Sequence, residues 1–332
     1  MSAPRANSEK NSRTGAATGP AVVDPAADSG TDPGADPAKN GKRPSEFSTL
    51  EDLRLTTPDG AAFVIRVLPQ PDPAAPVVLL LPAMAMKAKF YLPMAKALHA
   101  AGLAVATVDL RAQGESTPAL REAPEFGYRE LVEIDLPTIV DAVSERFPQA
   151  PLHLFGHSLG GQVALLFSAT APHKVAGVTV IGTGSVYWKA FEPRRWFEAL
   201  WKIQWIGLVA RVTGKWPGGV LIPGAMQGRL MADWSRHSLG SRYRPKGRTH
   251  DYDRKLAELR LPVLAISLDD DRLGPKSNVD FLCGRIASAE VTRWHIDASS
   301  DVAHRDHFEW IKDSAVIGPG IAAWIRDGRR PR

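Results

Sequence analysis

The residues best suited to chemistry lie in the sequence GHSLGG, which spans residues 156–161 and centres on Ser158. An apolar run precedes it and a segment of helical character follows it, which is the setting of a G-x-S-x-G turn that presents a nucleophilic serine. Such a turn strains the serine backbone, and side chains at Gly156 and Gly160 would crowd it. The helix that follows offers free N–H groups to a developing oxyanion. Ser158 is therefore the predicted nucleophile, with a glycine-rich strand-to-helix turn of no catalytic role as the alternative.

A serine hydroxyl needs a base to accept its proton and an acid to orient that base. When the serine lies in this kind of turn, the chain order is serine, acid, histidine, with both partners at downstream strand ends. The residues alone leave several candidates open. They are Asp269, Asp270 and Asp271 for the acid, and His304 and His307 for the base.

Metal chemistry is the weaker interpretation of the same loop. Asp301, His304 and His307 are residue types that bind zinc, but their spacing matches no common zinc motif. Cys283 is the single cysteine of the chain, which excludes a disulfide framework and any multi-cysteine metal site. We therefore expect neither a metal nor an organic cofactor.

The elements that must position these residues alternate along the chain. Several short runs are apolar at every residue, which is typical of strands buried on both faces of a parallel sheet. Helical periodicity fills the segments between them, so the pattern predicts an α/β fold with a doubly wound, mostly parallel sheet. A hairpin over residues 53–68 precedes this alternation. The expected strands are 77–81, 104–108, 152–155, 175–181, 263–267 and 290–295, and the expected helices are 90–101, 128–147, 160–170, 276–285 and 319–325, the last with Pro319 in its first turn.

The alternation stops between residues 182 and 253, a stretch that contains six of the nine tryptophans. We interpret it as a mainly helical insertion that covers one edge of the sheet, roofs the serine and forms an apolar acyl pocket from its tryptophans. Within it, residues 196–212 are apolar enough for contact with a lipid surface. Packing onto the main domain is the preferred interpretation, because Glu198, Lys202 and Arg211 interrupt the apolar run.

The first 45 residues differ from the rest, since Ala, Pro, Gly, Ser and Asp dominate them and they hold no aromatic residue. Such a composition predicts a disordered tail. It shows no apolar core of a secretory signal peptide, and no later run is long enough to span a membrane, so the expected location is cytoplasmic without stable membrane insertion. The net charge of +5 is unclustered, so no nucleic-acid partner is expected.

Three further motifs complete a resemblance to the α/β-hydrolase superfamily over about residues 48–328. Residues 109–116, DLRAQGES, are similar to its D-x-R-G-x-G-x-S loop, and residues 268–275 to its G-x-x-D-x-x-x-P block. His307-Phe308 is similar to its G-H-F ending. The resemblance implies a triad of Ser158, Asp271 and His307, and it makes residues 182–253 a cap between two parts of the core, 46–181 and 254–328.

The loop that normally reads His-Gly after the first parallel strand reads Pro82-Ala83 here, which resembles a little-studied bacterial branch of predicted hydrolases. The family pattern places the oxyanion donors on the backbone N–H groups of Met84 and Leu159. It implies a serine hydrolase that cleaves an ester or related acyl bond of a small, possibly lipid-like substrate through an acyl-enzyme. An acyltransferase, a cofactor-free haloperoxidase and a non-catalytic binding protein are the alternatives.

Overall fold

The computed structural model describes residues 46–219, 222–329 and 331. The tail 1–45, which the composition predicts to be disordered, lies outside the described residues.

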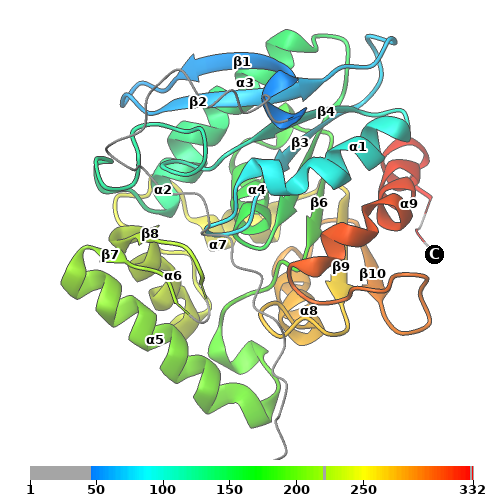
Figure 1. Cartoon of the computed structure of the whole chain (residues 1–332). Coiled ribbons are helices and arrows are strands. Elements are labelled where there is room, and N and C mark those ends of the chain that lie inside the picture. Colours follow the sequence, from blue (N-terminus) through cyan, green and yellow to red (C-terminus); the bar gives the residue numbers. More distant parts are fainter. Residues whose placement is uncertain (1–45, 220–221, 330, 332) are drawn as a thin grey trace, which may run out of the picture. The chain divides into compact units, whose positions relative to one another are not determined.

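Eight strands form one sheet in the order β1-β2-β4-β3-β5-β6-β9-β10 (Figure 1). The pairings β1–β2 and β2–β4 are antiparallel, and every later pairing in the sheet is parallel. The predicted doubly wound, mostly parallel α/β sheet is therefore confirmed. The strands are β1 (Glu51–Thr56), β2 (Ala62–Leu68), β3 (Val77–Leu81), β4 (Ala104–Val108), β5 (Leu152–His157), β6 (Gly177–Ile181), β9 (Val263–Leu268) and β10 (Val291–Ile296).

Helices cover both faces of the sheet, as the all-apolar strands require. Every residue of β3 is buried, and alternate residues of that strand belong to two separate apolar clusters. One cluster includes α1 and α9, and the other includes α3, α4, α7 and α8. These helices are α1 (Leu92–Ala100), α3 (Leu136–Arg146), α4 (Leu159–Thr170), α7 (Tyr252–Glu258), α8 (Lys276–Arg285) and α9 (Ser314–Asp327).

Two expected helices differ from the observed ones. The single helix expected over 128–147 begins as α2 (Tyr128–Glu130), continues as a π-helical turn over Leu131–Asp135 and only then becomes α3, whose second residue is Pro137. The expectation for the last helix is wrong at its start, because α9 begins at Ser314 and Pro319 lies inside it. A proline in the second turn removes only one backbone donor, so the packing of α9 on α1 tolerates it.

Residues 182–253 separate β6 from β9 along the chain but contribute no strand to the main sheet, in which β6 and β9 pair directly. Short 3-10 turns at Trp188–Ala190 and Pro193–Arg195 lead into the long helix α5 (Trp196–Thr213), which packs on α6 (Gly228–Gly240). A two-stranded ribbon, β7 (Lys215–Trp216) with β8 (Met226–Gln227), joins the two helices. No helix among the described residues combines the length and the apolar character needed to cross a membrane.

Candidate active site

Ser158 occupies a strained turn between β5 and α4. Its φ of 52° and ψ of −115° lie where side-chain-bearing residues are uncommon. A Cβ atom on Gly156 would lie 2.3 Å from the Cα atom of Gly161, and one on Gly160 would lie 2.3 Å from the carbonyl oxygen of Leu81 at the end of β3. A Cβ atom on Gly156 would also lie 2.6 Å from the carbonyl carbon of Gly160, so the glycines let the turn close on itself and let α4 begin against the neighbouring strand.

Asp271 and His307 form the buried acid–base pair of the site. The Nδ1 atom of His307 lies 2.7 Å from Oδ2 of Asp271, and the Asp271 side chain is fully buried. The other carboxylate oxygen accepts the backbone N–H groups of Leu273 at 2.8 Å and Gly274 at 2.7 Å. These bonds fix the carboxylate, which in turn fixes the orientation of the imidazole and its Nδ1–H tautomer.

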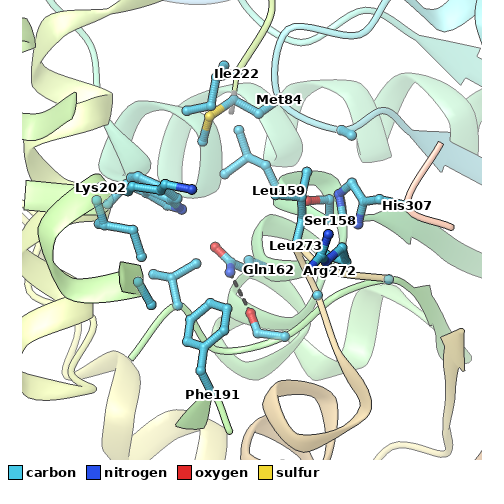
Figure 2. Close-up of a pocket in the computed structure, with 18 of the residues that line it drawn as sticks. Met84, Ser158, Leu159, Gln162, Phe191, Lys202, Ile222, Arg272, Leu273 and His307 are labelled. Carbon is cyan, nitrogen blue, oxygen red and sulfur yellow. Dashed lines mark hydrogen bonds between the residues drawn. The ribbon is translucent and has the colours of Figure 1, made fainter. Parts of the chain in front are cut away.

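Ser158 and His307 line the same pocket and lie side by side in it (Figure 2). Among the hydrogen bonds of the described residues, none joins the serine hydroxyl to the histidine ring. Catalytic hydrogen bonds are often long in unliganded enzymes and shorten when substrate binds, so this geometry is compatible with proton transfer. The two side chains face one cavity from two elements that are about 150 residues apart in the chain.

The other candidate acids and bases lie outside this arrangement. Asp270 is exposed and forms an ion pair with Arg305, 3.4 Å away. The Nδ1 atom of His304 lies 3.1 Å from Oδ2 of Asp313, and this hydrogen bond stabilises the loop that contains His304. Asp269 is also half-exposed. Within residues 46–219, 222–329 and 331, no group of three or more His, Cys, Asp or Glu side chains could hold a metal ion.

The backbone N–H groups of Met84 and Leu159 have no acceptor among the described residues. Both residues line the cavity. Leu159 is the first residue of α4, so its N–H also has the favourable end of the helix dipole behind it. Two free donors at this place can bind an oxyanion.

A buried pair, Tyr91 and His157, supports the loop that carries Met84. The Tyr91 hydroxyl accepts the N–H of Ala83 at 2.8 Å and lies 2.7 Å from Nδ1 of His157. Burial, and secondarily the nearby charge of His307, holds the pKa of His157 well below its ordinary value, so that histidine stays neutral. Sequence reasoning assigned His157 a structural role but missed Tyr91, because nothing local marks a buried tyrosine as a support for a distant loop.

The DLRAQGES segment has a structural role at the same loop. The Asp109 carboxylate accepts the N–H groups of Ala88 at 2.6 Å and Glu115 at 2.8 Å, and the Ser116 hydroxyl donates to the Asp109 carbonyl. A Cβ atom on Gly114 would overlap that carboxylate, 2.0 Å from one of its oxygens. The segment therefore ties the turn after β4 to the backbone just beyond the loop of residues 82–86.

The pocket beside Ser158 is apolar on the wall formed by residues 182–253. The cavity of about 110 Å³ extends between the serine turn and α5 (Figure 2). The side chains on this wall are Val186, Phe191, Ala199, Ile203, Ile222, Pro223 and Trp234. The insertion thus contributes an aliphatic and aromatic surface against which water is excluded.

Of the six tryptophans expected to form the pocket or to anchor the insertion, Trp234 is the one that lines the pocket. Trp216 is buried and donates its indole N–H to the Ile222 carbonyl at 3.0 Å, which anchors the β7 turn. Trp196 likewise donates its indole N–H to the Phe191 carbonyl at 2.7 Å. Trp201 and Trp205 point outward, with 62% and 51% of their surface exposed. Composition alone does not reveal whether an indole faces the pocket, the interior or the solvent.

Charged side chains gather where α5 and the acid loop meet the pocket. Lys202 lies 2.5 Å from Glu198, and the Arg195 guanidinium donates to the Arg272 carbonyl at 2.9 Å. All four side chains line the cavity. Three cations and one anion therefore surround an otherwise apolar site.

The chain is similar to known proteins along most of its length. A family model described as "Serine aminopeptidase, S33" matches residues 72–234. A monoacylglycerol lipase of Mycolicibacterium smegmatis is 26% identical over 281 residues, which cover 77% of this chain and 90% of that protein.

Solved structures agree on the fold. The mouse alpha/beta hydrolase domain-containing protein 10 superposes with a TM-score of 0.57 and 17% identity, covering 83% of this chain and 97% of that one. A putative lipase from Acinetobacter baumannii superposes with a TM-score of 0.56 and 14% identity, covering 83% and 91%. At such low identity these likenesses concern the architecture alone.

Proposed function

Because the chain belongs to the α/β-hydrolase superfamily and is a hydrolase, we propose that it is a serine esterase acting on esters of aliphatic acids. The observation that carries this proposal is the buried Asp271–His307 pair, 2.7 Å apart, which opens onto the same apolar pocket as the strained Ser158. A buried carboxylate next to an imidazole beside a free hydroxyl is the arrangement that activates serine.

In the proposed reaction, the Nε2 atom of His307 removes the Ser158 proton while the serine oxygen attacks the ester carbonyl. The N–H groups of Met84 and Leu159 stabilise the oxyanion, by about 3 kcal/mol per donor. Asp271 holds the imidazole and stabilises its positive charge. The imidazolium then protonates the alcohol, which leaves, and His307 activates water to release the acid from the acyl-enzyme.

We further propose an acyl ester of glycerol or a similar small alcohol as the substrate. The monoacylglycerol lipase relative supports this class, and the apolar wall suits an acyl chain. The charged side chains around Lys202 offer donors and acceptors to hydroxyl groups of the alcohol. In this proposal residues 182–253 act as a cap, since α5 and Trp234 supply the side of the pocket opposite Ser158.

The test is the hydrolysis of monooleoylglycerol and of p-nitrophenyl butyrate by Ser158→Ala and by two matched pairs of variants. One pair changes Asp271 or its neighbour Asp270, and the other changes His307 or His304. Ser158→Ala, Asp271→Asn and His307→Gln are expected to lower kcat by at least about 10³-fold, as triad substitutions do in serine hydrolases. Asp270→Asn and His304→Gln, which alter the neighbouring acid and histidine, are expected to leave kcat within about twofold.

A fluorophosphonate probe gives a second readout, because it labels only an activated serine. The native chain is expected to react and Ser158→Ala to remain unlabelled. Residual hydrolysis by Ser158→Ala above one-thousandth of the parent rate, or a larger loss for His304→Gln than for His307→Gln, contradicts the assignment.

A further inference from the structure

Exposed large apolar side chains are concentrated on one helix. Seven occur among the described residues, and five of them belong to α5. Their spacing of four, four, three and four residues places all five on one helical face. They are Phe197, Trp201, Trp205, Leu208 and Val212, with exposed fractions of 80%, 62%, 51%, 50% and 77%, and together they are called the α5 stripe.

The α5 stripe is the second apolar face of a helix that already buries one. Ala199, Ile203, Ile206 and Ala210 lie on the opposite side and are buried, and Gly207 allows close approach to Ser235 of α6. In Figure 1, α5 forms the outer edge of the insertion, with α6 between it and the sheet. A contiguous exposed apolar face of this kind is rare on proteins unless it binds something.

We propose that the α5 stripe docks onto a lipid bilayer surface that carries anionic headgroups. Phe and Trp are the side chains that prefer the boundary between headgroups and acyl chains. Trp201 and Trp205 stack on each other, with ring centres 6.3 Å apart, and so present one broad aromatic surface.

Charge favours the same partner. Outside the pocket lining, residues 188–216 hold four basic side chains, Lys189, Arg194, Arg211 and Lys215, and one acidic side chain, Glu192, an excess of three positive charges. Anionic lipid attracts such a segment by about 1 kcal/mol per basic residue near the surface. A second copy of this chain would instead bring two positive segments together, so the charge favours lipid over self-association.

Docking would place the active site at the lipid surface. The inner side of the same helix supplies Ala199, Lys202 and Ile203 to the pocket that contains Ser158. One helix therefore separates the bilayer from the serine, and an amphiphilic ester could enter along it without crossing bulk water. This part of the inference rests on the proposed esterase function, whereas the docking itself does not.

The test compares the full-length protein with two variants on sedimented vesicles. Phe197→Ser, Trp201→Ser and Trp205→Ser together remove the aromatic half of the stripe. Leu239→Ser with Val316→Ser is the matched control, because these residues are 52% and 47% exposed on other helices. One set of vesicles is pure phosphatidylcholine, and in the other set about a third of the phosphatidylcholine is replaced by phosphatidylglycerol.

The parent and the control are expected to bind the anionic vesicles, more weakly at high salt, and the triple variant to bind at least tenfold more weakly. Hydrolysis of soluble p-nitrophenyl butyrate should be equal in all three, while hydrolysis of monooleoylglycerol within vesicles should fall in the triple variant alone. Equal activity on the soluble ester shows that the triple variant is folded.

Three results overturn the docking. They are no binding of the parent to either vesicle, equal binding by the triple variant, and a parent dimer that the triple variant converts to monomer, which would make the stripe a contact between copies. Vesicle binding that depends on the stripe, in a protein that hydrolyses neither ester, would instead sustain the docking and reject the esterase proposal.

Discussion

Two helices of this protein, α4 and α5, are apolar on nearly every side and yet have opposite surroundings. In α4, which follows Ser158, 11 of 12 residues are buried. In α5 only 5 of 18 are buried, and the outer face is exposed along its whole length. The sheet covers α4 on one side and α7 on another, whereas α6 is the main neighbour of α5. An apolar helix is therefore a core helix only when the fold supplies neighbours on all sides.

The two helices also differ in how firmly their neighbours hold them. Gly160 at the start of α4 lies against backbone oxygens of the β3 end, which cannot move without disrupting the sheet. Gly207 in the middle of α5 lies against the side chain of Ser235, and nothing in the described part of the chain blocks α5 on its outer side. We expect α4 to be unable to shift when an added side-chain atom meets its neighbours, and α5 to move outward. Three predictions test this difference.

The largest effect is expected from one added methyl group at the start of α4. The Cβ of Gly160→Ala would lie 2.3 Å and 2.6 Å from the carbonyl oxygens of Leu81 and Pro82. We predict a loss of at least about 3 kcal/mol in the free energy of unfolding, together with most of the esterase activity.

The matched variant is Gly207→Ala, whose Cβ would meet the Ser235 Oγ atom at 2.2 Å. Because α5 is free to move outward, we expect a loss of only about 1 kcal/mol. Urea unfolding followed by circular dichroism measures both. A smaller loss for Gly160→Ala than for Gly207→Ala would mean that α4 is the more adaptable helix.

The same truncation on both helices tests burial directly. Leu166 of α4 is fully buried and Leu208 of α5 is 50% exposed. Leu166→Ala is expected to lower the free energy of unfolding by about 3 kcal/mol, because it leaves a cavity, and Leu208→Ala by less than about 1 kcal/mol. Equal losses in urea unfolding would show that the outer face of α5 is covered in solution.

The smallest effect is a pH dependence shared by the two regions. Burial lowers the pKa of His153 in β5, the strand that leads into α4, to about 4, and it lowers the pKa of His237 in α6, whose ring stacks on Tyr243, to about 4. Unfolded histidine titrates near 6.5, so below that pH the unfolded chain binds protons that the native protein does not. Stability should therefore fall as the pH drops from 6.5 towards 4, by about 1.4 kcal/mol per histidine at pH 5.5.

Urea unfolding at pH 7.5 and pH 5.5 measures this difference, and His153→Gln and His237→Gln should each reduce it. The change in the pH dependence is the readout, since either substitution can also alter stability at both pH values. If His237→Gln leaves the dependence unchanged while His153→Gln reduces it, the site of His237 beside Ser185 and Tyr243 is open to water in solution.

Much of the sheet and the serine turn could be predicted because their signals are local. A strand buried on both faces is apolar at every residue, as β3 is, and a strand-to-helix turn as tight as that at Ser158 needs glycine wherever backbone approaches backbone. The choice of Asp271 among three aspartates and of His307 over His304 came from the resemblance to a family. The residues alone left both choices open, and the structure brings this pair within hydrogen-bond distance.

The sequence by itself determined where strands, helices and the serine turn occur, since these depend on periodicity and on the backbone freedom of glycine. Only the tertiary structure decided which side chains meet. Tyr91 contacts His157, which is 66 positions away in the chain, and the backbone of Ala83, which is 8 positions away. The tryptophans of residues 182–253 divide into anchors, one pocket residue and an exposed stripe. Burial and contact depend on neighbours that are distant in the chain, and no local pattern carries that information.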